Sequence, residues 1–353
     1  MKLIVIPGDG IGPETVAVAT EALNIVSNRF KLGLDLQFEL GGHDSLKKYG
    51  TTVRDGLLDI IKNADGLLLG PMSTYELKDE SKGEINLSKY YRKELDLYAN
   101  IRPAKTYPGS GSVYKPLDLV VVRENTEGFY ADRNMESGGS EMLVTKDVVV
   151  SLRRITRQCC ERIARSAFEL AMTRKKHVTI VHKGNVLRMG DGMFIDSCRL
   201  IAKEYPEVKV DDVIVDAMMA HVVRAPERYD VLVTTNMFGD ILSDLTAELA
   251  GSLGMAGSIN AGADYAMAQA AHGSAPDIAG QNIANPFSQV ISAAMLLAWY
   301  GQRKGRTEFL QASQALHDVV ARTIAAGQGT RDVGGHNGTR EAGSYLVKLL
   351  NNI

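Results

Sequence analysis

Short apolar runs rich in β-branched residues alternate with longer stretches of helical periodicity along this 353-residue chain, and this alternation limits the possible folds most strongly. Each short run has the composition of a buried strand. The runs lie at residues 2–6, 35–40, 66–70, 117–123, 177–183, 212–216 and 231–235. A helical period of about 3.6 residues begins at Pro13 and recurs over residues 147–173. Strands that alternate with helices predict an α/β fold.

The charge and the cysteines argue against several classes of function. Lys+Arg 40 against Asp+Glu 42 leave a formal net charge of −2, which offers no overall attraction to nucleic acid or to an anionic membrane. Local arginines must therefore hold any acidic substrate. Cys159, Cys160 and Cys198 are odd in number and lack metal-site spacing, so we do not expect a framework of disulfides. We therefore expect the protein to lie in the reducing cytoplasm. No apolar run is long enough for a signal sequence or a bilayer span, so we expect neither export nor membrane insertion.

A glycine-rich turn at residues 6–14 lies between the first predicted strand and the first predicted helix, where dinucleotide-binding proteins carry a phosphate loop. Its glycines follow the spacing G-x-G-x-G, which differs from that of the phosphate loop. Asp9 and Glu14 also place negative charge where a pyrophosphate would bind. A purely structural turn and a turn that contacts a ligand both remain open.

Asp240 and Asp244 are spaced i, i+4 in a predicted helix, so their side chains share one face. A bound cation would offset the repulsion between these like charges, and oxygen ligands favour Mg²⁺ or Mn²⁺. Asp216, at the end of a predicted strand, is a third acid at an edge where ligand sites of α/β proteins gather. The alternative is that these are solvated surface aspartates.

Basic and phenolic side chains occur where an anionic substrate would be held. Arg123 ends a strongly apolar predicted strand, where a guanidinium group needs an anion, whereas Arg92 is equally compatible with a surface salt bridge. Lys183 also ends a predicted strand and is a candidate general base. Tyr130, in the turn after Arg123, is either core filling or a proton donor.

Together these segments resemble the β-decarboxylating dehydrogenases, a family that includes isocitrate, homoisocitrate, 3-isopropylmalate, tartrate and D-malate dehydrogenases. The matching segments are residues 6–14, 92–105, 121–130, 182–185, 236–244 and 272–286. The resemblance implies a two-domain α/β fold of the isocitrate/isopropylmalate dehydrogenase type, not a Rossmann fold. It places residues 1–98 and 251–353 in a large cofactor-side domain, and residues 99–250 in a small central domain with the metal site and the dimer interface.

The resemblance also implies roles for the candidate residues. Arginines would hold the carboxylates of the substrate: Arg92, Arg102 and Arg123. Aspartates would bind Mg²⁺ or Mn²⁺: Asp216, Asp240 and Asp244. Lys183 would remove the proton of the 2-hydroxyl group as a hydride leaves for NAD, and Tyr130 would return a proton after carbon dioxide departs. The enzyme would be a homodimer, with Lys183 and Asp216 reaching into the partner's site.

Residues 272–278 carry the cofactor prediction. In the family, members that use NAD have an acid at the position of Asp277, and members that use NADP have a lysine followed by a tyrosine. A carboxylate accepts hydrogen bonds from the adenosine ribose and repels a 2′-phosphate, which favours NAD. The expected NAD contacts are His272, Gly273, Ser274, Ala275, Asp277, Ile278 and Asn285.

Departures from the family pattern bear on the substrate. Before the first arginine, isopropylmalate enzymes have leucines, isocitrate enzymes have a serine and then an asparagine, and this chain has Asn86 and then Ser88. Leaving such polar groups unsatisfied against an alkyl substituent would cost roughly 1–3 kcal/mol each, which favours isocitrate or homoisocitrate over 3-isopropylmalate, tartrate or D-malate. Gln269 replaces the usual glutamate, which leaves another malate derivative open. A non-catalytic regulatory subunit is a further alternative, which the retained Tyr130 and Lys183 argue against.

Overall fold

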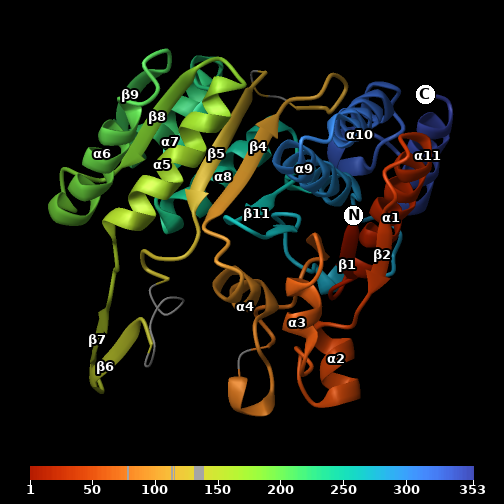
Figure 1. The fold of residues 1–353 in the computed structure, drawn as a ribbon, viewed down its shortest axis with the longest axis horizontal. Coiled ribbons are helices and arrows are strands. Elements are labelled where there is room, and N and C mark those ends of the chain that lie inside the picture. The colour runs from red at the N-terminus through yellow and green to blue at the C-terminus, as the bar shows by residue number, and fades with distance from the viewer. Residues whose placement is uncertain (78, 113, 115, 131–138) are drawn as a thin grey trace.

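The computed structural model describes residues 1–77, 79–112, 114, 116–130 and 139–353, and its centre is a ten-stranded sheet (Figure 1). The strand order is β2-β1-β3-β12-β11-β4-β5-β10-β8-β9. The strand bounds are β1 Lys2–Ile6, β2 Asp35–Phe38, β3 Gly66–Leu69, β4 Ala99–Lys105, β5 Asp118–Glu124, β8 His177–His182, β9 Lys209–Ile214, β10 Val231–Thr234, β11 Ile259–Ala261 and β12 Ala266–Ala268. The α/β fold expected from the alternating pattern is confirmed.

Parallel and antiparallel pairings divide this sheet into regions. β1 pairs in parallel with β2 and β3, and β10 pairs in parallel with β5 and β8. Between these regions β11 is antiparallel to both β12 and β4, and β4 is antiparallel to β5. Parallel strands covered on both faces read as continuous apolar runs, which is why β1 and β10 are detectable in the sequence.

Helices cover both faces of the sheet (Figure 1). Their bounds are α1 Gly12–Arg29, α2 Gly42–Tyr49, α3 Leu57–Lys62, α4 Leu87–Glu94, α5 Arg157–Met172, α6 Arg188–Ala202, α7 Val215–Arg224, α8 Asn236–Ala250, α9 Phe287–Lys304, α10 Thr307–Ala325 and α11 Thr339–Asn351. Alternate β5 residues separate two cores: Val120 and Val122 pack with α5 and α6, whereas Leu119 and Val121 pack with α7 and α8. This alternation is the period-2 pattern of a strand buried on both faces.

The strands from the two chain ends and those from the middle of the chain occupy different halves of the sheet. The half from β2 to β11 comes from both ends, and α1, α9, α10 and α11 pack in one core beside it. The half from β4 to β9 comes from the middle. Ile259 of β11 pairs with Ile101 of β4, so the sheet is continuous across the expected boundary. The division into two domains therefore stays a prediction.

The expected bounds of two elements are wrong. The helix expected over residues 147–173 begins only at Arg157, because Thr156 caps it by accepting a hydrogen bond from the Cys159 amide. The strand expected over residues 212–216 is β9, which ends at Ile214, so Asp216 lies in the first turn of α7. No helix among the described residues is long and apolar enough to cross a bilayer.

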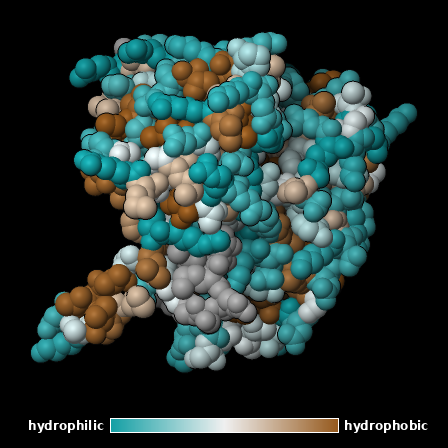
Figure 2. All heavy atoms as spheres, turned by 60° about the vertical axis from the view of Figure 1, so that its left-hand side comes forward, coloured by the Kyte–Doolittle hydropathy of each residue, from teal (hydrophilic) through white to brown (hydrophobic). Residues whose placement is uncertain are grey.

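Residues 148–151 instead form strand β7 (Val148–Ser151), which pairs with β6 (Glu141–Thr145) in a separate two-stranded sheet. The β-branched valines of this segment favour a strand over a helix. The β6–β7 hairpin projects from the body of the molecule (Figure 1), and Figure 2 shows apolar side chains gathered on it. Its exposed apolar residues are Met142, Leu143, Val144, Val148, Val149 and Val150. A two-stranded hairpin is at best marginally stable in water. An exposed apolar surface of this kind is typical of a contact with another molecule.

Candidate active site

A polar cavity of about 300 Å³ lies where α4, β4, β5 and α8 meet the segments that follow β3 and β12. We call it the polar cavity because charged and amide side chains line much of it. The predicted substrate residues are all in its wall, together with the predicted proton donor and one predicted metal ligand: Asn86, Ser88, Arg92, Arg102, Arg123, Tyr130 and Asp240. Segments that are distant in the sequence therefore form one pocket for an anion.

Buried arginines flank the aspartates of α8. Nη1 of Arg102 lies 3.2 Å from Oδ1 of Asp240 and 3.2 Å from Oδ1 of Asp244, and Arg123 contacts Asp240 through its own Nη1. Partial burial raises the pKa of Asp244; Arg102 opposes this effect, and Asp240 adds to it. The Tyr130 hydroxyl lies 3.5 Å from Oδ2 of Asp240. Positive charge, carboxylates and a phenol thus meet at one edge of the cavity.

Amide side chains that the sequence reasoning missed orient these arginines. Oδ1 of Asn236 accepts hydrogen bonds from Nε and Nη2 of Arg123, at 3.0 and 2.7 Å. Oδ1 of Asn100 accepts one from Nε of Arg102, at 2.7 Å. The sequence spacing could have indicated both residues. Asn236 precedes Asp240 by one helical turn and Asn100 precedes Arg102 by one strand repeat, so each asparagine lies on the same face as a predicted site residue. Each amide fixes one edge of a guanidinium group and leaves another for an anion.

Asp240 and Asp244 fit a divalent cation in chemistry, because both carboxylates are partly exposed, at 36% and 55%. Carboxylate oxygens are the donors that Mg²⁺ and Mn²⁺ prefer. Among the described residues no group of three or more His, Cys, Asp or Glu side chains could hold a metal ion. Within the described part of the chain, Asp240 and Asp244 therefore offer two carboxylates to a cation.

Lys183 and Asp216 lie together, apart from the polar cavity of their own chain. Nζ of Lys183 lies 2.5 Å from Oδ1 of Asp216, and neither residue is among those that line the cavity. The hydrogen bond from Lys183 lowers the pKa of Asp216. Asp191, a buried residue that the sequence reasoning missed, accepts a hydrogen bond from the Lys183 amide at 2.5 Å. The structure of one chain therefore does not bring this pair together with the other predicted site residues.

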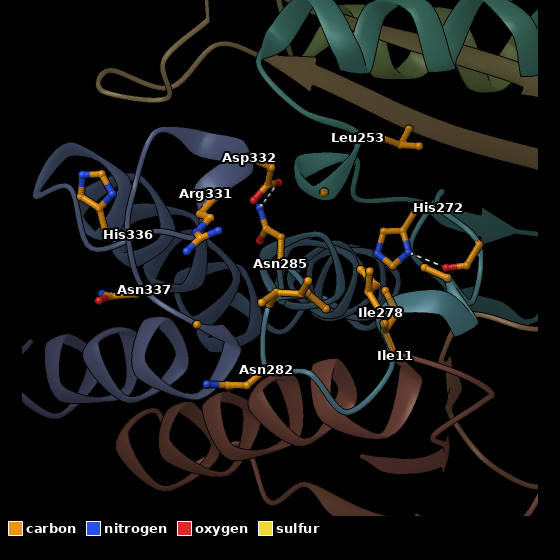
Figure 3. Close-up of a pocket in the computed structure, with 16 residues that line it drawn as sticks. Ile11, Leu253, His272, Ile278, Asn282, Asn285, Arg331, Asp332, His336 and Asn337 are labelled. Carbon is orange, nitrogen blue, oxygen red and sulfur yellow. Dashed lines mark hydrogen bonds between the residues drawn. The ribbon is translucent and has the colours of Figure 1, made fainter.

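A second, larger cavity of about 730 Å³ adjoins the polar cavity, and we call it the large cavity (Figure 3). It contains most of the predicted NAD contacts: His272, Gly273, Ala275, Ile278 and Asn285. Figure 3 shows Asn285 directed toward Asp332, and Nδ2 of Asn285 donates to Oδ2 of Asp332 at 2.8 Å. His272 and Gly273 line both cavities, so ligands in the two would be neighbours.

Some predicted cofactor residues lie outside the wall of the large cavity. Asp277 is exposed, and its backbone carbonyl accepts a hydrogen bond from Gln281 at 2.7 Å. Ser274 is buried, and its carbonyl accepts a hydrogen bond from the amide of Ile11 at 2.8 Å. A Cβ atom at Gly10 would lie 2.0 Å from that carbonyl oxygen, so the turn needs glycine there. The glycine-rich turn is thus bound to the 272–278 segment, and Ile11 itself lines the large cavity.

Comparisons with known proteins agree over the whole length of the chain. Residues 2–346 match the family model described as isocitrate/isopropylmalate dehydrogenase. A 3-isopropylmalate dehydrogenase of Archaeoglobus fulgidus is 39% identical over 99% of each chain. An isocitrate/homoisocitrate dehydrogenase of Thermus thermophilus is 38% identical over 100% of this chain and 99% of its own. The crystal structure of isocitrate dehydrogenase from Methylococcus capsulatus superposes with a TM-score of 0.87 at 37% identity, covering 99% of each chain.

Proposed function

The chain belongs to the isocitrate/isopropylmalate dehydrogenase family of oxidative decarboxylating dehydrogenases, and on that basis we propose that it oxidises and decarboxylates a malate-type acid whose carbon 3 carries an anionic substituent. Isocitrate and homoisocitrate are the favoured substrates. One observation supports this choice most: polar and basic side chains line the polar cavity beside α4, including Asn86, Ser88 and Arg92. An alkyl substituent would leave the Ser88 hydroxyl proton and the Nδ2 group of Asn86 without an acceptor from the substrate, at roughly 1–3 kcal/mol each.

The residues of the polar cavity divide the chemistry between them. Arg92, Arg102 and Arg123 hold the carboxylates of the substrate, and Asn100 and Asn236 keep the guanidinium groups in place. Tyr130 stands 3.5 Å from Asp240 and supplies the proton that carbon 3 takes after carbon dioxide leaves.

Asp240 and Asp244 would hold Mg²⁺ or Mn²⁺. When bound, the ion supplies Lewis acidity toward the 2-hydroxyl group and the adjacent carboxylate. Asp216 of the partner subunit would add a third carboxylate, since no group of three such side chains occurs among the described residues of one chain. Lys183, also from the partner subunit, would accept the proton of the substrate's 2-hydroxyl group.

A homodimer is therefore the active unit in this proposal. Two features support it: Lys183 and Asp216 do not line the polar cavity of their own chain, and the β6–β7 hairpin exposes apolar side chains such as Leu143, which is 71% exposed. A second copy of the hairpin would cover this surface by symmetric pairing.

NAD is the proposed cofactor, in the large cavity. The support is Asp277, which directly precedes the cavity residue Ile278 and would repel a 2′-phosphate. Free, buried Cys159, Cys160 and Cys198 suit a reducing compartment, and we place the enzyme in the cytoplasm.

A substrate panel tests the proposal directly. Purified protein with Mn²⁺ and NAD is given isocitrate, homoisocitrate, 3-isopropylmalate, tartrate and D-malate in parallel, and reduced nicotinamide is followed by its absorbance. We expect the highest kcat/KM with isocitrate or homoisocitrate. 3-Isopropylmalate is the second candidate, favoured by the relative from Archaeoglobus fulgidus. No turnover of any of these acids would contradict the proposal.

A further inference from the structure

Gln269 lies just after β12 and forms part of the wall of the polar cavity, although its side chain is only 6% exposed. Its Nε2 atom donates hydrogen bonds to the backbone carbonyl of Gly70, at 3.3 Å, and to the hydroxyl of Ser88, at 2.9 Å. The same side chain therefore touches the end of β3 and the start of α4, where the predicted specificity residues lie.

The Gly70 carbonyl determines which end of the Gln269 amide faces this corner. If the amide were reversed, Oε1 would lie against the Gly70 oxygen, and two acceptors would meet without a proton between them. A glutamate here would create the same conflict while ionised. The corner formed by Gly70 and Ser88 thus suits an amide donor, which is what this chain supplies at position 269.

This arrangement decides how Ser88 can bind a ligand. A serine hydroxyl has one proton to donate and two lone pairs to accept with. Because Ser88 accepts from Gln269, its own proton is left to donate, and no hydrogen bond among the described residues has the Ser88 hydroxyl as its donor. With an ionised glutamate at position 269, the Ser88 proton would be drawn to the carboxylate instead.

The neighbours of Ser88 also present donors. Oδ1 of Asn86 accepts the Lys89 amide at 3.0 Å as the N-cap of α4, which leaves the Nδ2 group of Asn86 to donate. Arg92 and Lys89 line the same wall and have only donors on their side chains. A wall made of donors matches an anion, and a carboxylate accepts several such bonds at once.

We propose that Gln269 is a positioning residue that turns the Ser88 hydroxyl into a hydrogen-bond donor toward the carboxylate of the substituent that carbon 3 of the substrate carries, and so sets the selectivity for that substituent. The inference rests on the proposed function and adds a residue to its specificity. Gln269 acts through Ser88, whereas Ser88 touches the substrate.

The test compares isocitrate, which has a carboxylate-bearing substituent on carbon 3, with D-malate, which has none. For wild-type protein, Gln269→Glu, Ser88→Ala and the double variant, kcat and KM are measured with both acids. We expect Gln269→Glu and Ser88→Ala each to lower the isocitrate/D-malate ratio of kcat/KM by about 10- to 100-fold, mainly through KM, as for loss of a hydrogen bond to a charged group. The double variant should be little worse than either single variant, because both remove the same donor.

A pH series separates positioning from simple structural damage. As the new carboxyl of Gln269→Glu ionises, KM for isocitrate should rise with pH, and Ser88→Ala should lack this rise. Gln289→Glu is the matched control, because Nε2 of Gln289 donates to the Leu69 carbonyl at 3.2 Å, the residue is also buried, and it does not line the cavity. Its isocitrate/D-malate ratio should stay at the wild-type value.

The outcomes distinguish this inference from the proposed function. If wild-type protein turns over no malate derivative, the proposed function fails, and the inference fails with it. If wild-type protein uses isocitrate but folded Gln269→Glu and Ser88→Ala keep its substrate ratio, only the inference is overturned. A fall in the ratio that Gln289→Glu shares equally would also overturn it.

Discussion

Nη1 of Arg102 lies 3.2 Å from Oδ1 of Asp240, so a buried cation of β4 holds a carboxylate of α8 at the edge of the polar cavity. A divalent cation at Asp240 would have to share this oxygen with Arg102 and Arg123, or displace their contacts to it. These ion pairs hold Asp240 and Asp244 near the guanidinium groups, which are the groups that the proposed function assigns to the carboxylates of the substrate.

Asp240→Asn should lower metal-dependent turnover sharply, because the amide keeps the shape but loses the charge. We expect Mn²⁺ affinity to fall by more than about 100-fold, beyond the loss typical of residues that only support a metal ligand. Calorimetric titration with Mn²⁺ measures this without turnover. Asp318→Asn, at an exposed position on α10, is the control. Equal Mn²⁺ affinity in Asp240→Asn and wild-type protein would refute the metal assignment.

Gly239→Ala should displace Arg123, since a Cβ atom there would lie 2.6 Å from Cγ of that arginine. We expect a stability loss of about 1–3 kcal/mol, typical of an overpacked core, together with a higher KM for the substrate. Thermal unfolding and steady-state kinetics measure both. Gly192→Ala, in α6, is the matched control, because its Cβ would meet nothing within 4 Å; it should gain about 0.5–1 kcal/mol. Equal changes in stability and in KM for the two substitutions would show that Gly239→Ala does not act by displacing Arg123.

Mixing two inactive variants tests whether the site is shared between subunits. Lys183→Ala damages the partner's site in the proposed dimer, whereas Asp240→Asn damages the site of its own chain. After the two are unfolded and refolded together, half of the dimers should be mixed, each with one intact site, which restores about a quarter of wild-type activity. If both residues served the same chain's cavity, the mixture would remain inactive.

Stability should decrease as the pH falls below about 6.5, because burial lowers the pKa values of His272 and His317 from that ordinary value. The unfolded chain then binds protons that the folded chain excludes, so each histidine stabilises the fold above its unfolded pKa and loses this contribution on acidification. The slope can approach about 1.4 kcal/mol per pH unit for each histidine. Denaturant unfolding at several pH values measures it. His317→Gln should reduce the slope of the free energy of unfolding against pH. An unchanged slope would exclude His317 as a source of the pH dependence.

Asp277→Lys should shift cofactor use from NAD toward NADP. A lysine there would attract a 2′-phosphate that the aspartate repels, and Arg331 already lines the large cavity. We expect the NAD/NADP ratio of kcat/KM to fall by at least about 10-fold, which corresponds to roughly 1.4 kcal/mol. Asp318→Lys makes the same charge change on α10 and should leave the ratio alone. A constant ratio in Asp277→Lys would remove the support for NAD.

Elements buried on both faces could be predicted from the sequence, and irregular ones could not. β1 and β10 are continuous apolar runs, whereas β11 and β12 are each three residues long and β4 contains both Arg102 and Pro103. Such strands exist because their neighbours in the sheet complete their hydrogen bonds, and single-sequence patterns carry little of that information.

By itself the sequence determined which residue types are available to the site, since the proposed metal ligands and the proposed carboxylate-binding arginines are in the chain whatever its fold. It also placed Asp240 and Asp244 on one helical face, because that relation is local. Only the tertiary structure decided that Gln269 meets Ser88 across 181 positions of sequence, and that Asp277 lies outside the wall of the large cavity. Contacts between distant segments depend on how the sheet and helices pack, and neither periodicity nor spacing specifies that packing.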